Sequence, residues 1–194
     1  MGGYEHFFYP NIACFMGKVF SEIDAPMQEW CAHQHIFFVA TAPLSGDGHI
    51  NCSPKDAASF RILDAMTVAY QDQTGSGVET IAHLRENGRI VIMFCSFEKV
   101  PRILRFYGKG EVILPENPEF TTLREHFPQR SGTRAIIRIR LDRIADACGF
   151  GVPFYDYLGE RDVLEKWATT KGTEGVAEYQ ASKNVVSIDG LSGL

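Results

Sequence analysis

A glycine-rich stretch near the middle of the chain carries residues that could bind an anion. It reads Asp72-Gln73-Thr74-Gly75-Ser76-Gly77-Val78-Glu79-Thr80 and stands between an apolar run and an amphipathic segment. Glycines let a ligand approach the main chain, and the unpaired N–H groups of a following helix favour a phosphate. The same residues also form a capping box from Ser76 to Glu79, which satisfies those N–H groups without a ligand. The stretch lacks the lysine of a nucleotide-binding P-loop, which favours the capping box, and the anion site stays as the alternative.

Basic side chains elsewhere could complete such a site. Lys55 follows Ser53 and Pro54 at the end of a predicted strand. Proline there is expected to stop the strand and hold the lysine near a barrel mouth, where its ammonium could face a phosphate or simply be solvated. Arg102 and Arg105 lie three positions apart on a later strand, so at most one of them faces the same site. Of the two we choose Arg105, which lies deeper in the segment.

Other chemistries have little support in the sequence. The six histidines show no H-x-x-x-H or H-E-x-x-H spacing, so no metal site is expected. No G-x-S-x-G elbow is present, and no catalytic residue can be assigned. The five cysteines contain no C-x-x-C pair and indicate reduced thiols in a cytoplasmic protein. Cys52 and Cys95 lie on apolar strands and are expected to be buried and inert.

Composition narrows the class of protein further. A chain of 194 residues with 45% hydrophobic residues predicts one packed domain. We place this single domain at residues 16–194, after an N-terminal extension of unassigned role at residues 1–15. The formal charge of −5 argues against a nucleic-acid partner. No apolar run approaches the roughly eighteen residues of a membrane span, and no secretory signal is evident, so no membrane partner is expected.

Apolar periodicity and turn residues predict a mainly β chain with peripheral helices. Strands in several hairpin-scale connections indicate an antiparallel sheet closed on itself, because a parallel sheet would need regular β-α alternation. A hairpin turn is expected at Ser45-Gly46-Asp47-Gly48. The predicted strands are residues 35–43, 49–53, 66–71, 89–96, 102–114 and 134–141, and the predicted helices are residues 24–34, 78–87, 118–127 and 160–183. Asp24 is expected to cap the first helix, and Asn87-Gly88 is expected to end the second.

Three of these strands carry further information. The core of residues 89–96 is apolar on both faces, which predicts cover on two sides, by a barrel interior and by a helix or second subunit. Gly108 and Gly110 predict a bend or bulge in the following strand. Residues 134–141 alternate, with Ala135, Ile137, Ile139 and Leu141 on one face.

With these landmarks in place, the chain resembles the pyridoxamine 5′-phosphate oxidase-like family of FMN-binding split barrels. The resemblance covers residues 16–194, and it rests on five stretches taken together: residues 49–55, 67–84, 89–95, 102–110 and 148–153. It implies an antiparallel split β-barrel. It also implies a homodimer with two flavin sites at the subunit interface, where basic and hydroxyl side chains hold the FMN phosphate.

Carried onto this sequence, the resemblance implies cofactor-binding roles for Ser53, Lys55, Thr74, Ser76, Thr80 and Arg105. Glu79 would be repelled by a phosphate, so we interpret it as part of the helix cap. The chain departs from its relatives at Asp56, Gln71, Gln73 and Lys99-Val100-Pro101. An acid beside Lys55 would weaken anion binding by about 1 kcal/mol.

The function that this resemblance implies is an FMN-dependent oxidoreductase acting on a small organic substrate. The alternative is a flavin-independent isomerase or cyclase of secondary metabolism that uses the same cleft, as the polar departures suggest. A third reading is a binding module for haem or a deazaflavin. Tyr155, Tyr157 and Trp167 are expected to pack against the domain and not to cover the pocket.

Overall fold

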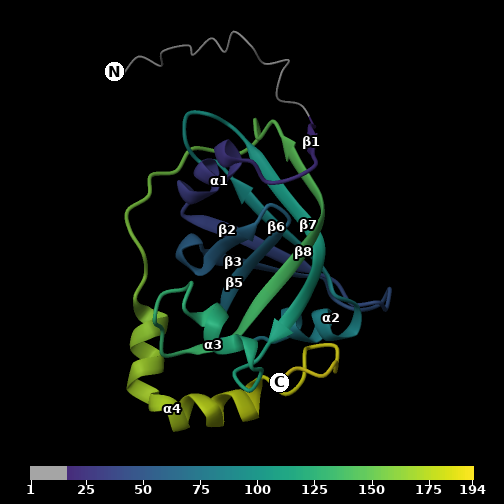
Figure 1. Cartoon of the computed structure of the whole chain (residues 1–194). Coiled ribbons are helices and arrows are strands. Elements are labelled where there is room, and N and C mark those ends of the chain that lie inside the picture. The colour runs from purple at the N-terminus through teal and green to yellow at the C-terminus, as the bar shows by residue number, and fades with distance from the viewer. Residues whose placement is uncertain (1–16) are drawn as a thin grey trace.

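A curved antiparallel sheet wraps around an apolar interior in the computed structural model, which describes residues 17–194 (Figure 1). The strand order is β3-β2-β6-β7-β8-β5-β4, and β1 pairs with β8. The predicted extension at residues 1–15 lies outside the described residues. The strands are β1 Val19–Phe20, β2 Ile36–Thr41, β3 Asn51–Asp56, β4 Phe60–Asp64, β5 Thr67–Gln73, β6 Arg89–Cys95, β7 Ile103–Ile113 and β8 Thr133–Ala147.

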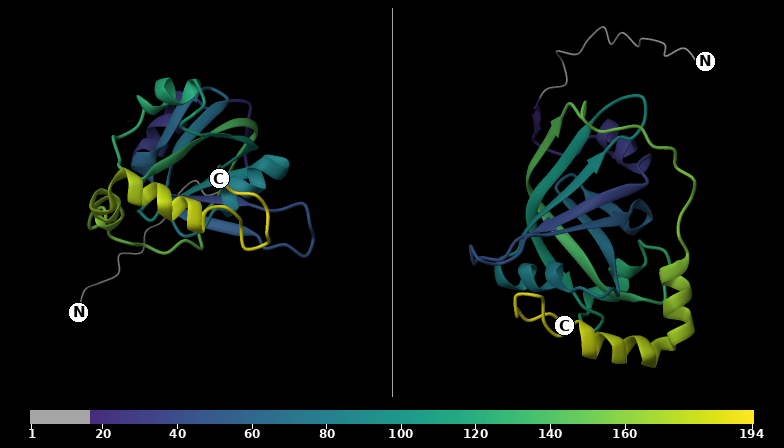
Figure 2. Two further views of the ribbon diagram at one scale, coloured as in Figure 1. Left: turned by 90° about the horizontal axis from the view of Figure 1, so that it is seen from below. Right: turned by 180° about the vertical axis from the view of Figure 1, so that it is seen from behind.

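The helices lie around this sheet. They are α1 Ala25–Ala32, η2 Ala57–Ser59, α2 Glu79–Asn87, α3 Glu119–Arg124 and α4 Val163–Lys183. The two views in Figure 2 show α4 as two arms beneath the open end of the barrel. The arms meet at Gly172, whose φ of 68° breaks the helix. None of the described helices has both the length and the apolar composition needed to cross a membrane.

The barrel interior is filled by aliphatic side chains packed around a group of aromatic rings. Phe37, Phe94 and Phe106 are fully buried, and Phe60 lies 5.0 Å from Phe94 between ring centroids. The alternation predicted for residues 134–141 is confirmed, because Ala135, Ile137, Ile139 and Leu141 all join this core. A smaller cluster on the other face of β8 contains Ile136, Ala69, Ile113 and Phe127.

The predicted bulge in the long strand β7 is confirmed. The register with β8 shifts between Tyr107 and Gly108. A Cβ atom at Gly108 would collide with the carbonyl oxygen of Arg140 on β8, so only glycine lets the two strands approach at this point. The long antiparallel pair β7 and β8 therefore bends as a barrel wall must.

Two helices begin or end at the capping residues that the sequence predicts. Asp24 caps α1 by accepting a hydrogen bond from the Met27 amide at 2.8 Å. Gly88 ends α2 with a left-handed φ of 71°, as predicted for the Asn87-Gly88 pair. The predicted helix at residues 118–127 is shorter in the structure, where it ends at Arg124.

Two expectations about the strands are wrong. Pro54 does not end β3, which continues to Asp56 with Pro54 opposite Phe38. Because β3 is an edge strand, the side of Pro54 without a donor needs no partner, and proline is tolerated there. In addition, β4 was absent from the predicted strands; it follows β3 after the single turn η2.

Candidate functional site

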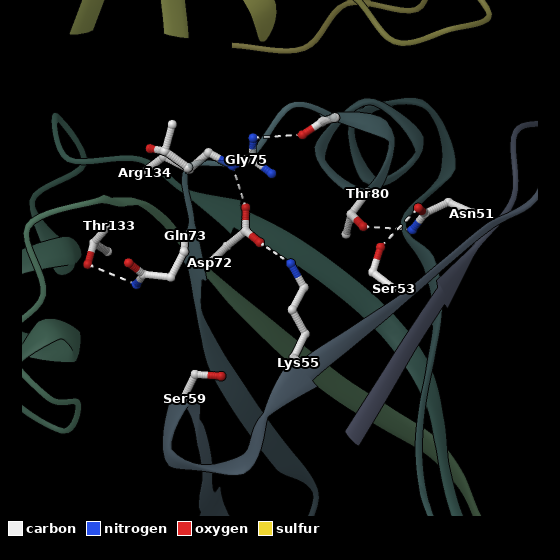
Figure 3. Close-up of polar contacts among 12 residues, drawn as sticks. Asn51, Ser53, Lys55, Ser59, Asp72, Gln73, Gly75, Thr80, Thr133 and Arg134 are labelled. Atoms are coloured by element: carbon white, nitrogen blue, oxygen red, sulfur yellow. Dashed lines mark hydrogen bonds and ion pairs between the residues drawn. The ribbon is translucent and has the colours of Figure 1, made fainter. Parts of the chain in front are cut away.

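A buried acid joins two bases near the glycine-rich turn (Figure 3). The side chain of Asp72 is completely buried. It accepts hydrogen bonds from Lys55 Nζ at 2.9 Å and from Arg134 Nε at 2.6 Å. Burial by itself would raise the pKa of Asp72, but the charges and hydrogen bonds of Lys55 and Arg134 outweigh it and hold that pKa below its ordinary value. Asp72 is therefore ionised, and the three side chains carry a net charge of +1.

Strand pairing explains how these side chains meet. Lys55 lies opposite the core residue Phe37, so both side chains project to the interior side of the sheet. Asp72 and Arg134 come from the neighbouring strands β5 and β8. Sequence reasoning missed the roles of Asp72 and Arg134. The signal available was a charged residue inside each of two otherwise buried strands, a position that requires a partner.

The glycine-rich turn is held by side chains that follow it in the chain. Arg134 Nη1 donates to the Gly77 carbonyl at 2.8 Å and to Asn184 Oδ1 at 3.0 Å. Asn184 Nδ2 in turn donates to the Gly75 carbonyl at 3.0 Å. Neither Gly75 nor Gly77 has a positive φ. The shape of the turn is therefore set by Arg134 and Asn184 and not by left-handed glycines.

The predicted capping box is wrong. Helix α2 begins at Glu79, its cap position is Val78, and no side chain bonds the cap. Ser76 is exposed. The Glu79 carboxylate instead accepts a hydrogen bond from the amide of Ile188 at 3.3 Å, because the C-terminal segment returns to lie beside the helix start.

A cavity of about 180 Å³, here called the small cavity, lies between β3, the glycine-rich turn and the start of α2. Asn51 sets the orientation of two hydroxyl groups in it. Its amide nitrogen donates to Thr80 Oγ1 at 3.0 Å, and its amide oxygen accepts from Ser53 Oγ at 3.1 Å. The cavity thus brings together three of the sequence-predicted site residues, Ser53, Lys55 and Thr80, and adds Arg134.

The other predicted site residues lie elsewhere. The amide and hydroxyl of Thr74 both donate to the Gly132 carbonyl, and its hydroxyl accepts from Gln180, so its hydrogen-bonding groups are engaged. Ser76 does not line the small cavity. Arg105 alternates with the buried residues Leu104 and Phe106 and so projects from the outer face of the sheet. Its part in binding a cofactor stays a prediction.

A second cavity of about 840 Å³, here called the large cavity, shares Lys55 and Gln73 with the small one. The irregular segment before α4 forms one wall. On this wall Tyr157 stacks on His35 with ring centroids 3.7 Å apart, and Tyr155 lies 5.4 Å from Phe97. Tyr155 and Tyr157 therefore line a cavity, contrary to expectation. Trp167 packs against Tyr179, as expected.

The polar departures from the family pattern have separate roles. Asp56 accepts two hydrogen bonds from Arg130, at 2.9 and 2.7 Å, so its charge is offset by a neighbouring guanidinium. Gln71 is buried and donates to the Pro128 carbonyl and Thr133, and it lines neither cavity. Gln73 lines both cavities. The expected competition between Asp56 and an anion at Lys55 is therefore reduced, and the acid that pairs with Lys55 is Asp72.

Cys52 and Cys95 differ in their exposure to solvent. Cys95 is buried, and burial raises the pKa of its thiol, as expected for an inert residue. Cys52 is exposed, contrary to expectation, because it points outward from the edge strand β3. Within residues 17–194 no group of three or more His, Cys, Asp or Glu side chains is placed to hold a metal ion.

The fold and the two cavities define a protein of the antiparallel split-barrel class. The family profile of pyridoxamine 5′-phosphate oxidase matches residues 23–148, and the chain belongs to that family. It is 40% identical over 185 residues to the pyridoxamine 5′-phosphate oxidase family protein ustO of Aspergillus flavus, a match that covers 87% of this chain and 74% of ustO. Among solved structures, HupZ of Group A Streptococcus superposes with a TM-score of 0.50 at 23% identity, over 69% of this chain and 99% of HupZ. That likeness supports the fold.

Proposed function

We propose that this protein is an FMN-dependent oxidoreductase acting on a small organic substrate. The phosphate would occupy the small cavity, and the isoalloxazine ring and the substrate would share the large one. The observation that carries the proposal is that Lys55 and Gln73 line both cavities. The groups that could donate hydrogen bonds to a phosphate therefore adjoin the large cavity with its aromatic wall. A volume of about 840 Å³ is within the usual range for small-molecule sites.

The donor groups of the small cavity fit a phosphate. The Lys55 ammonium and the Arg134 guanidinium supply positive charge, and Thr80, which accepts from Asn51, keeps its own hydroxyl hydrogen available. Asp72 offsets part of this charge, and so does Glu79, which lines the cavity and accepts a hydrogen bond from the Ile188 amide. Lys55 can turn toward an anion without leaving Asp72 unpaired, because Arg134 still bonds the second carboxylate oxygen.

When bound, FMN supplies hydride-transfer chemistry. The residues of this chain would bind the phosphate of FMN and orient the cofactor. Lys55 and Thr80 hold the anion, Asn51 holds the Thr80 hydroxyl in place, and Gln73 borders both the phosphate region and the ring region. The rings of Tyr155 and Tyr157 would offer apolar faces along one wall of the large cavity.

A homodimer is part of the proposal. The outer face of β2, β6 and β7 carries half-buried apolar side chains, among them Phe38, Met93 and Tyr107. A second subunit on this face would supply the second cover expected for residues 89–96. Arg105 projects from this face, so in a dimer it could reach the partner's site. Sedimentation equilibrium is expected to give twice the chain mass, and a monomer would contradict this part.

We also place the protein in the cytoplasm, because the described cysteines are unpaired.

A second candidate function is a flavin-independent isomerase or cyclase that uses the same cleft. The observation in its favour is Asp72, which already engages both bases of the small cavity. In such a protein Lys55 and Arg134 would serve only to hold the strands together.

The test is an absorption spectrum of freshly purified protein, followed by titration with FMN. Release of free FMN on denaturation of the protein would identify the bound cofactor directly. Protein that carries no flavin and does not quench the fluorescence of added FMN would overturn the first proposal and favour the second. A Soret band would instead indicate haem.

A further inference from the structure

The large cavity has an excess of negative charge among its lining residues. Besides two histidines, His33 and His35, it is lined by three Lys and Arg side chains. Two of these three are engaged by acids, since Lys55 bonds Asp72 and Arg130 bonds Asp56. Of the remaining charged lining residues, one is basic, Arg161, and four are acidic. The acids are Glu98, Asp156, Glu160 and Glu165. Within residues 17–194, neither Glu98 nor Asp156 forms an ion pair. An anionic substrate would therefore be repelled from this wall, and a cationic one attracted.

Aromatic faces line the same space. His35 and Tyr157 stack with an interplanar angle of only 4°, and Phe97 and Tyr155 form a second ring pair. Tyr155 is 68% exposed and Tyr157 is 50% exposed, so both present ring surface that residues 17–194 leave uncovered. The Tyr157 hydroxyl donates to Glu160 at 2.8 Å, which keeps that ring at the cavity edge. Such surfaces bind flat rings and also attract cations to their faces.

We propose that the large cavity binds an aromatic substrate that carries a basic nitrogen. The ring lies against Tyr155 and Tyr157, and the protonated nitrogen lies toward Glu98 and Asp156. The inference rests on the proposed function for the role of this cavity, since it names the class of substrate that an oxidoreductase would receive there. The lining residues are consistent with it: Glu98 and Asp156 line the large cavity and do not line the small one, whereas Lys55 lines both.

A matched set of three probes tests the charge preference directly. Tyramine, 4-ethylphenol and 3-(4-hydroxyphenyl)propanoate share a phenol ring and differ in carrying a positive, neutral or negative group. Their dissociation constants are measured at pH 7 by isothermal titration calorimetry on the full chain. Tyramine is expected to bind about tenfold more tightly than the propanoate, with 4-ethylphenol between them. Equal binding of tyramine and the propanoate, or no binding of tyramine, would overturn the proposal.

Variants then locate the effect. Replacing both acids, Glu98→Gln with Asp156→Asn, is expected to weaken tyramine about threefold to tenfold and to leave 4-ethylphenol unchanged. The matched control Glu116→Gln removes an exposed carboxylate outside the cavity and should change neither probe. Tyr157→Ala should weaken both probes. If the double variant keeps the full preference for tyramine, the two acids are not the recognition groups and the assignment is wrong.

The same titrations are repeated with FMN present, which separates this inference from the proposed function. A protein that binds no FMN but prefers tyramine would contradict only the flavin proposal. A protein that binds FMN and shows no preference among the probes would contradict only the substrate class.

Discussion

The ammonium of Lys55 and the buried carboxylate of Asp72 lie 2.9 Å apart and connect the two ends of the sheet. Lys55 is on β3, one terminal strand, and Asp72 is on β5, which pairs with the other terminal strand β4. No main-chain ladder joins β3 to β5. The ion pair therefore bridges the open side of the split barrel, at the place where the small and large cavities meet.

Replacing Lys55 tests its proposed contact with phosphate. Lys55→Ala is expected to weaken FMN binding about tenfold or more, because a charge-assisted bond to an anion is lost. Lys55→Met should weaken it similarly, because it keeps much of the aliphatic side chain and removes only the charge. Fluorescence quenching of FMN gives the dissociation constants. Lys166→Ala, on an exposed helix face, is the control. FMN affinity equal to that of the unaltered protein in both Lys55 variants would exclude the contact.

The ionisation of Asp72 gives stability a defined pH dependence. Its folded-state pKa lies below the ordinary value of 3.8, so the unfolded chain takes up the proton first. The stabilisation is therefore complete above pH 3.8 and is lost as the pH falls through the folded-state pKa. Asp72→Asn should lower the free energy of unfolding at pH 7 by about 3–5 kcal/mol.

Urea denaturation at a series of pH values measures this effect. The difference in unfolding free energy between the unaltered protein and Asp72→Asn is expected to shrink below pH 3.8. Asp47→Asn, at an exposed turn position, serves as the reference. A difference that stays constant with pH would mean that Asp72 is not ionised in the folded protein.

The C-terminal segment is predicted to stabilise the glycine-rich turn through Asn184. This side chain is fully buried and bonds both the Gly75 carbonyl and Arg134. Asn184→Ala leaves buried polar groups without partners and should cost about 1–3 kcal/mol. Hydrogen exchange of the amides at residues 74–78 should accelerate. Ser182→Ala, at an exposed position, should leave that exchange unchanged; slow exchange in Asn184→Ala would contradict the role.

Close packing of β7 on β8 predicts a marked effect at Gly108. A methyl group there meets the carbonyl of Arg140, a main-chain atom that cannot move without disturbing the strand. Gly108→Ala should lower the melting temperature, with a loss of about 2–3 kcal/mol or more. Gly46→Ala is the matched control, since among the described residues no heavy atom would lie within 4 Å of its Cβ. Equal melting temperatures for the two variants would show that the strands can separate locally.

Much of the fold could be predicted from local patterns. The Asp24 cap, the Gly88 end of α2, the Gly108 bulge and the alternation from Ala135 to Leu141 each follow from steric and burial rules that act within a few residues. The short strand β4 escaped prediction because it has no clear alternation and a single turn separates it from β3. The capping box failed because Ser76 and Glu79 had an alternative that local rules cannot include: a C-terminal segment that returns to the helix start.

By itself, the sequence determined a mainly β chain of one family, with a lysine and hydroxyl residues suited to an anion. Only the tertiary structure decided which of these meet. It placed Ser53, Lys55 and Thr80 around one cavity, placed Arg105 on the opposite face, and paired Lys55 with Asp72. The reason is physical: the side of the sheet on which a residue lies follows from its own strand, but its neighbours across the open side depend on how far the whole sheet curls.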